Sequence, residues 1–386
     1  MDMVLRAWAE DITAPIERVT AALSRLRDDP TALGPDALDD EGWVALLGAS
    51  GTELEELCEL ADAVRGRVTE PGVLTFVVNR NLDTGVAARL ISDERRSDDP
   101  TLADLVGEAV ELGATEICMQ GPLPADRPAG DYVRLVEEIT GAADGLHLHA
   151  YRAAEIADGA TRTGTTVDEH LRRLLAAGLG SIPGTAAQIL DDTVRGYLSP
   201  TGSAPAREWI EVIEAAHGVG LFSTATIVYG HVETPGQQVA HLRTLLGIQR
   251  RTGGFSELIL MPMVSSNTPP HLIDAATSSA SQRETRALHA VARLMSAGLI
   301  DHLQVAWTKL GSDTVDLLLR GGADDIGGLL LDGRLMPHAG PEAGRVLDVD
   351  TLVAVADRAG RTPRQRTTRY AEPETHRLLP LPRVRS

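Results

Sequence analysis

Two histidines, two positions apart, are the residues of this sequence whose type and spacing most directly suggest chemistry. His147 and His149 lie in the apolar run Leu146–Tyr151, and residues two apart on a strand share one face. Imidazole titrates near neutral pH, so the pair could bind substrate or do acid–base work. With Glu116 or Glu233 as a carboxylate partner, the pair could also be half of a metal site, although a lone H-x-H is no metal signature. We predict pocket-lining histidines and no bound metal; the structural alternative is one core histidine and one wall residue.

A second polar group, Tyr229-Gly230-His231-Val232-Glu233, ends another apolar run. Glycine permits a close backbone approach to a ligand, and His231 and Glu233 are further acid–base candidates. The alternative is a strand-to-helix turn in which Glu233 lies near a helix start, where an acidic residue is favoured.

Cationic residues supply a third group of candidates. Lys309 follows Trp307 by two residues and could bind an anion or act as a base. Arg80, beside Asn79, could bind a substrate carboxylate through two hydrogen bonds. The alternatives are an ordinary surface lysine and an arginine held in an internal salt bridge.

These residues need elements to position them, and the sequence alternates short apolar runs with helical segments up to about residue 330. We predict strands at Leu74–Val78, Glu116–Gln120, Leu146–Tyr151, Leu179–Ile182, Phe222–Tyr229, Leu258–Met261, Gln304–Trp307 and Ile326–Leu331. We predict helices at Leu102–Glu111, Tyr132–Thr140, Val167–Ala177, Glu208–His217, Gln237–Arg251, Ser281–Ala297 and Thr314–Arg320. Eight such units predict an α/β fold of the (β/α)8 barrel type. The absence of a G-x-G-x-x-G after a first strand disfavours a doubly wound sheet.

The predicted domains are an N-terminal helical extension (residues 1–70), the barrel (71–335), and a C-terminal helix with an Arg- and Pro-rich tail (336–386). The chain has 386 residues, 43% of them hydrophobic, and a formal net charge of −19. Such an acidic chain repels phosphate backbones and anionic lipid, which argues against nucleic-acid or membrane partners. No apolar run of 18 residues and no signal-peptide pattern occur, and two cysteines make no disulfide framework. We expect a cytoplasmic protein with a small-molecule substrate, and a homo-oligomer or a protein partner stays open.

Several segments, taken together and in order, resemble one enzyme family. They are Val73–Asn81, Gly113–Gln120, Leu146–Tyr151, Gly178–Ala186, Tyr229–Glu233, Thr252–Phe255, Trp307–Gly311 and Asp325–Gly328. They resemble the tyrosine-using half of FO synthase, the 5-amino-6-(D-ribitylamino)uracil–tyrosine transferase of the radical S-adenosylmethionine (SAM) superfamily. The resemblance implies a radical SAM barrel. It also implies that the positions holding SAM are Met119, Gln120, Ser181, Gln188, Tyr229 and Glu233.

The sequence departs from this family in three places. The family's first strand is followed by a C-x3-C-x2-C loop that binds a [4Fe-4S] cluster, whereas the segment 82–100 here contains no cysteine. Gln188 stands where the family usually has Glu, and the segment 331–337 differs from the family's acidic, serine-containing one. Because three thiolates are the usual protein ligands of such a cluster, we expect no [4Fe-4S] cluster, while SAM stays a candidate ligand.

From these departures we predict a cluster-less enzyme that carries out a redox-neutral reaction on an amino-acid or aromatic metabolite, by SAM-dependent group transfer or polar rearrangement. The alternatives are a non-catalytic partner or regulatory subunit of an active radical SAM enzyme and, with less support, a metal-dependent hydrolase. The catalytic candidates are His147, His149, His231, Glu233 and Lys309. The substrate-binding candidates are Asn79, Arg80, Glu116 and Trp307.

Overall fold

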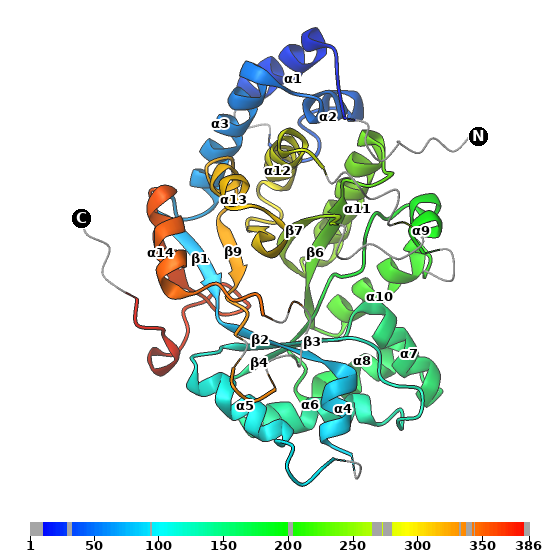
Figure 1. Cartoon of the computed structure of the whole chain (residues 1–386). Coiled ribbons are helices and arrows are strands. Elements are labelled where there is room, and N and C mark those ends of the chain that lie inside the picture. The colour runs from blue at the N-terminus through cyan, green and yellow to red at the C-terminus, as the bar shows by residue number, and fades with distance from the viewer. Residues whose placement is uncertain are drawn as a thin grey trace. The chain divides into compact units, whose positions relative to one another are not determined.

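The computed structural model describes residues 11–28, 33–92, 95–199, 204–264, 272, 280–331, 333–336, 342 and 344–381. Helices and strands alternate along the chain (Figure 1), so the predicted α/β class is confirmed. The chain divides into two compact units that interleave in sequence. Unit 1 comprises residues 1–73, 187–208 and 225–326, and unit 2 comprises 74–186, 209–224 and 327–386.

Unit 1 contains the N-terminal helices and the second half of the alternating pattern. Its helices are α1 (Ile16–Asp28), α2 (Asp40–Leu47), α3 (Gly51–Val68), α9 (Asp192–Leu198), α11 (Pro235–Thr252), α12 (Gln282–Ser296) and α13 (Ser312–Leu319), with a 3-10 turn η3 (Trp307–Lys309). Its strands are β7 (Phe255–Pro262), β8 (Leu303–Val305) and parts of β6 (Phe222–Tyr229) and β9 (Asp325–Gly328), hydrogen-bonded in the order β9-β8-β7-β6. Helix α10 (Ala206–Gly218) begins in unit 1 and continues in unit 2.

Unit 2 contains the first half of the alternating pattern and the C-terminal residues. Its helices are α4 (Thr84–Leu90), α5 (Leu102–Glu111), α6 (Asp131–Ala142), α7 (Ala153–Thr163), α8 (Val167–Ala177) and α14 (Val349–Arg358), with a 3-10 turn η4 (Thr375–Arg377). Its strands are β1 (Val73–Val77), β2 (Asn79–Asp83), β3 (Glu116–Gln120), β4 (His147–Ala150), β5 (Ser181–Ile182) and β10 (Thr362–Gln365). They form the runs β10-β1-β9 and β6-β5-β4-β3-β2.

The helix starts follow from local sequence. Thr101 and Asp104 make a reciprocal capping box at α5, and Thr166 and Glu169 do the same at α8. Each box satisfies backbone N–H groups that the first helical turn leaves without partners. Capping residues therefore fix where each helix begins, and with it the length of the preceding loop.

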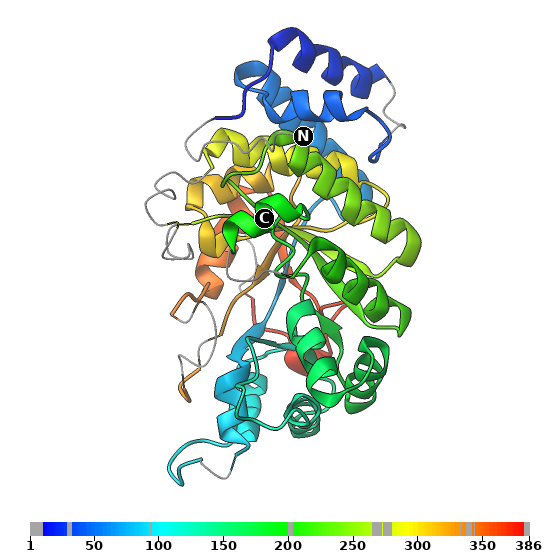
Figure 2. The same ribbon diagram turned by 90° about the vertical axis from the view of Figure 1, so that its right-hand side faces the viewer.

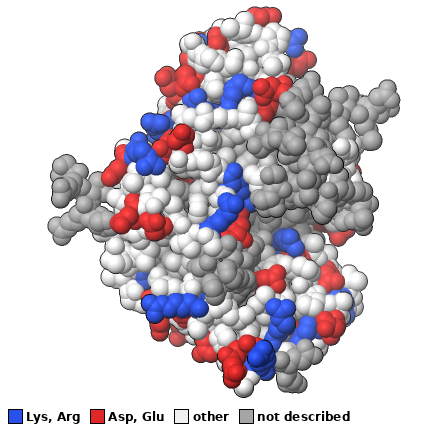
Figure 3. All heavy atoms as spheres, viewed as in Figure 1, with Lys and Arg blue, Asp and Glu red and all other residues white. Residues whose placement is uncertain are grey.

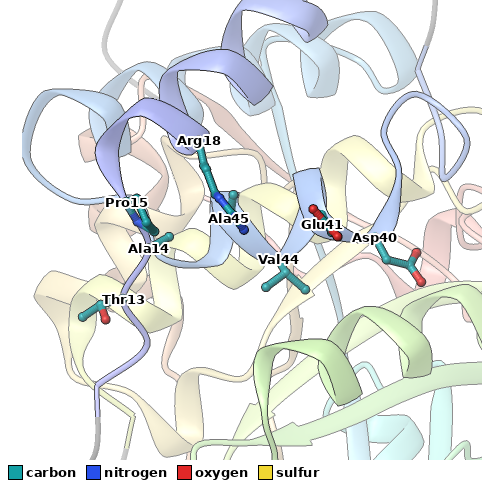
Figure 4. Close-up of a pocket in the computed structure, with 8 residues that line it drawn as sticks. All are labelled: Thr13, Ala14, Pro15, Arg18, Asp40, Glu41, Val44 and Ala45. Carbon is teal, nitrogen blue, oxygen red and sulfur yellow. The ribbon is translucent and has the colours of Figure 1, made fainter.

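The N-terminal helical extension packs within unit 1, where α3 and α2 contact α12 (Figures 1 and 2). A pocket of about 270 Å³ lies beside α2 in this region (Figure 4). Its lining residues are Thr13, Ala14, Pro15, Arg18, Asp40, Glu41, Val44 and Ala45. None of the residues predicted to form a site lines it, and the Asp40 carboxylate already pairs with Arg243.

The C-terminal segment 361–381, here called the strap, is packed onto unit 2. The Arg366 backbone N–H donates to the Phe76 carbonyl over 2.8 Å, and the Leu379 N–H donates to Gln365 Oε1, also over 2.8 Å. The Arg377 side chain is buried and reaches the carbonyls of Ala114 and Asp144. The Arg- and Pro-rich sequence therefore forms fixed structure, because its polar groups find backbone partners.

Two differences from the expected elements stand out. The predicted first strand, Leu74–Val78, is β1 shifted by one residue, and neither β2 nor β10 was predicted. The predicted domain boundaries at 70 and 335 stay a prediction.

On the face drawn in Figure 3, the basic and acidic side chains of described residues are interspersed. Among the described helices, none combines the length and apolar character needed to span a bilayer. The cytoplasmic location stays a prediction.

Candidate functional site

A row of polar side chains crosses one face of strands β2 to β5 in unit 2. In the parallel register, Asn79 pairs with Glu116, and Glu116 with His147. Residues paired in this way point to the same face, and alternate residues along each strand share it. The row, here called the polar row, consists of Asn79, Asn81, Glu116, Cys118, Gln120, His147, His149 and Ser181. The opposite face carries mainly apolar residues: Leu82, Ile117, Met119, Leu148 and Ala150.

Ser181 joins the two predicted histidines. Its hydroxyl lies 2.7 Å from His147 Nε2 and 2.6 Å from His149 Nδ1. Ser181 is fully buried, and His149 is 7% exposed. The structure therefore brings His147 and His149 together, as the sequence predicted, and adds a hydroxyl that bridges them.

Burial keeps both imidazoles neutral at pH 7. Desolvation lowers the pKa of His147 to about 4, even though nearby Glu116 acts in the opposite direction. Desolvation, with the positive charge of Arg366, also lowers the pKa of His149 to about 4. The pair is thus a hydrogen-bonding surface, with one donor and one acceptor nitrogen on each ring.

The strap reaches the same row. Thr368 Oγ1 donates to Glu116 Oε2 over 2.6 Å, and both residues are buried. Arg366 lies 3.9 Å above the Tyr370 ring, and Arg369 lies 4.0 Å above the Phe222 ring. No local pattern predicts the bond between Thr368 and Glu116, because it joins positions 252 residues apart.

The row does not begin where the active sites of barrel enzymes lie. Residues that line such a site come from the carboxyl ends of strands, but His147 and Glu116 are the first residues of β4 and β3. Gln120 is the last residue of β3, and Thr185 Oγ1 lies 3.4 Å from its Oε1. The row therefore runs from the amino ends of these strands to the carboxyl end of β3.

Arg80 is not available to bind a substrate carboxylate. Its guanidinium pairs with Glu108 of α5 at 2.8 Å and also donates to the backbone carbonyls of Leu105 and Leu335. Arg80 is 1% exposed. The internal salt bridge considered as the alternative is the arrangement that the structure shows.

Met119, which the resemblance assigned to SAM, has other surroundings in unit 2. It is fully buried and lies on the face opposite the polar row. Asn79, the substrate-binding candidate, lies in the row and accepts a hydrogen bond from the Leu330 N–H over 3.2 Å. Met119 therefore packs among apolar residues, whereas Gln120 and Ser181, the other SAM candidates of this unit, lie in the row itself.

In unit 1, Glu233 holds its own loop together. One carboxylate oxygen, Oε1, accepts from the Gly230 N–H and from Gln238 Nε2, each over 2.7 Å. The other oxygen, Oε2, accepts from the His231 N–H over 2.9 Å, and His231 Nδ1 lies 2.9 Å away. Glu233 and His231 are fully buried. This favours the turn alternative, in which Glu233 shapes the loop before α11.

The remaining predicted residues of unit 1 are spread over several elements. The Tyr229 hydroxyl, fully buried, donates to Thr285 Oγ1 over 3.2 Å. Gln188 has a positive φ of 51° and accepts from the Val228 N–H over 3.0 Å. Trp307 and Lys309 lie in the turn η3 and are half-buried. Their roles stay predictions.

The described cysteines do not fit the cluster that the radical SAM fold implies. Cys58 lies on α3 and Cys118 on β3, both buried, and desolvation raises their pKa values to about 11 and about 12. A thiolate is the ligand form, and three are the usual protein ligands. The segment after β2 forms helix α4, whose start is capped by Asp83. We therefore derive no reaction step through a cluster. Among the residues that the structure describes, no group of three His, Cys, Asp or Glu side chains could hold a metal.

Comparison with solved structures gives the class of protein. The chain superposes on HydG, a maturase of the [FeFe]-hydrogenase, with a TM-score of 0.65 at 13% identity, covering 91% of this chain and 77% of that one. Methylornithine synthase (PylB) gives a TM-score of 0.60 at 16% identity, and the match covers 90% of this chain and 97% of that one. The chain therefore shares the α/β fold of these two enzymes, and the predicted fold, including its N-terminal helices, is confirmed.

Sequence comparison gives the family. Residues 252–378 match the model of the CofH/MqnC C-terminal region. FO synthase of Streptomyces coelicolor is 42% identical over 364 residues, which are 91% of this chain and 41% of that protein. FO synthase of Mycobacterium tuberculosis is 42% identical over 372 residues, which are 93% of this chain and 43% of that protein. The 5-amino-6-(D-ribitylamino)uracil–L-tyrosine 4-hydroxyphenyl transferase of Methanothermobacter thermautotrophicus is 34% identical over 370 residues, which are 92% of this chain and 98% of that protein.

The chain belongs to this FO synthase and 4-hydroxyphenyl transferase family, as its resemblance predicted. It spans less than half the length of the FO synthases and nearly all of the methanogen relative. The predicted redox-neutral function, with its non-catalytic alternative, is contradicted, because the relatives are enzymes named for FO synthesis or 4-hydroxyphenyl transfer.

Proposed function

We propose that this chain is an enzyme that acts on the substrate classes named for its methanogen relative, an aminouracil with a sugar-alcohol side chain and tyrosine. The polar row of unit 2 would bind the aminouracil. The support is the similarity of the two chains over nearly their whole length, together with the chemistry of the row.

The observation that carries the binding proposal is the pair of neutral histidines bridged by Ser181. A uracil ring is uncharged and presents alternating N–H donors and C=O acceptors. Ser181 takes one nitrogen of each ring, so each neutral imidazole still offers one nitrogen, as a donor or as an acceptor, and the Gln120 amide offers both. A buried site of this kind selects a ligand that satisfies its polar groups, because an unpaired buried group is costly.

The residues of this chain would bind and orient the heterocycle and exclude water from it. SAM is proposed as a second ligand on the basis of family membership, with Gln120 as the candidate of unit 2 that lies at a strand end. Gel filtration would test the oligomeric state, which the structure leaves as a prediction.

The test is calorimetric titration of 5-amino-6-(D-ribitylamino)uracil into the wild-type protein and into His149→Ala. Loss of one or two buried hydrogen bonds should weaken binding by roughly tenfold or more. His376→Ala is the matched control, because this histidine is 67% exposed and pairs only loosely with Glu374 at 3.5 Å. Equal affinity in wild type and His149→Ala would contradict the assignment of the row, and no binding to the wild type would contradict the proposed substrate.

A further inference from the structure

The bridge through Ser181 has a property that neither histidine has alone. A serine hydroxyl carries a single hydrogen, so it can donate to only one of the two ring nitrogens that it contacts. The other histidine must then donate its N–H to the Ser181 oxygen. The contacts of 2.7 Å and 2.6 Å therefore force one ring to accept and the other to donate.

We propose that His147, Ser181 and His149 form a proton relay that carries a proton from a ligand bound at His149 toward the amino end of β4. This inference rests on the proposed function, because the aminouracil supplies the ring N–H. The relay starts with His149 donating from Nδ1 to Ser181 and with Ser181 donating to His147 Nε2. His149 Nε2 then carries no hydrogen, so its lone pair can accept a proton from the ligand. His147 carries its hydrogen on Nδ1.

The proton balance of one passage is complete. The ligand N–H gives its proton to His149 Nε2, and the ligand nitrogen keeps the electron pair. The His149 Nδ1 hydrogen passes to Ser181, the Ser181 hydrogen passes to His147 Nε2, and the His147 Nδ1 hydrogen passes to a solvent water, since His147 is half-buried. Both rings end as neutral imidazoles of the other tautomer, and no electron is transferred.

The surroundings favour this concerted exchange over a charged intermediate. Burial lowers the pKa of each ring to about 4, so an imidazolium in the row would be costly. The charged groups acting on the pair are Glu116 from β3 and Arg366 and Arg369 from the strap. Thr368 bonds to Glu116, which holds that carboxylate in place beside His147.

The geometry also gives His147 a fixed orientation. A side chain at Gly180 would place its first carbon 2.6 Å from His147 Nδ1 and 2.3 Å from Cε1. Only glycine leaves room for the ring at this point. The Phe222 ring also packs against it, with the ring centres 5.4 Å apart and the planes tilted by 40°. The ring is thus clamped with Nε2 toward Ser181, as a relay requires.

The test is nitrogen NMR of protein labelled at the histidine rings, with signals assigned through His147→Gln and His149→Gln. In the ligand-free wild type, the tautomers of His147 and His149 should be linked, and Ser181→Ala should change both. Ser181→Thr keeps the hydroxyl and suits a strand, so it should restore the wild-type pattern. If Ser181→Ala leaves the tautomer of either ring unchanged, the relay is refuted.

A second arm adds 5-amino-6-(D-ribitylamino)uracil. In the wild type both histidines should switch tautomer together, and in Ser181→Ala only His149 should respond. A switch of His149 alone in the wild type would overturn the relay while leaving the proposed substrate intact. Failure of the ligand to bind would overturn the proposed function, and the ligand-free arm would still decide the relay.

Discussion

Replacing Glu233 by glutamine should destabilise the protein strongly, although the change conserves size. The carboxylate accepts three hydrogen bonds, from Gly230 N–H, Gln238 Nε2 and His231 N–H. The oxygen of the glutamine amide can still accept from the Gly230 N–H and from Gln238 Nε2. The amide nitrogen then faces the His231 N–H, and two donors cannot form a hydrogen bond. The loop before α11 should therefore lose one charge-assisted bond and weaken two others.

The magnitude follows from typical hydrogen-bond energies. A lost bond to a charged group costs about 1.5–3 kcal/mol, and turning two charged bonds into neutral ones costs roughly 1 kcal/mol each. Burying a neutral amide costs less than burying a carboxylate, which offsets part of this sum. We expect Glu233→Gln to lower the free energy of unfolding by about 2–4 kcal/mol and Glu233→Ala to lower it further.

Urea denaturation followed by circular dichroism would measure the effect, with the denaturant slope checked for constancy. Glu138→Gln is the matched control, since its side chain is 48% exposed and lies 3.9 Å from Arg134. That substitution should change the stability by less than about 0.5 kcal/mol. A Glu233→Gln protein as stable as this control would refute the view that Glu233 holds its loop together.

Three further outcomes are expected. Arg80→Met should destabilise the fold by roughly 2–4 kcal/mol, because it removes the buried guanidinium that pairs with the half-buried Glu108 and donates to two backbone carbonyls. Thermal unfolding should show Arg80→Lys to be milder, since it keeps the charge; equal losses would contradict a role for that charge. Thr368→Val should cost about 1.5–3 kcal/mol by removing the bond to Glu116, while Thr368→Ser should be near wild type in the same denaturation assay. Because the folded pKa of His149 lies below its unfolded value of about 6.5, the unfolded state binds more protons between those pH values. Stability should therefore fall as pH drops from about 6.5 to about 4, and His149→Gln should reduce that slope in a series of melting temperatures; an unchanged slope would contradict a neutral buried ring.

Continuous apolar runs made most strands predictable. Strands β3 and β6 have the predicted bounds, because each contains a short apolar run, Ile117–Met119 in β3 and Ile227–Tyr229 in β6. Strand β10 reads Thr-Pro-Arg-Gln and has no such pattern, so only its pairing partner reveals it. Local sequence therefore predicted the strands that are buried on both faces. It missed β10, which is recognised as a strand only through its pairing with β1, far away in the sequence.

The site was predictable only in part for a related reason. The spacing of His147 and His149 placed both on one face, which the structure shows. The bridging role of Ser181 depends on the register between β4 and β5, which no local pattern encodes. The pairing of Arg80 with Glu108 likewise depends on how α5 packs against β2, so the sequence left that alternative open.

The bond between Thr368 and Glu116 joins residues 252 positions apart. During synthesis at about 5–20 residues per second, Glu116 would emerge from the ribosome well before its hydroxyl partner. Nascent chains stopped before the strap would therefore carry an incomplete row, in which Glu116 lacks the hydroxyl of Thr368. Assembly of the amino end of the polar row thus follows the synthesis of the strap.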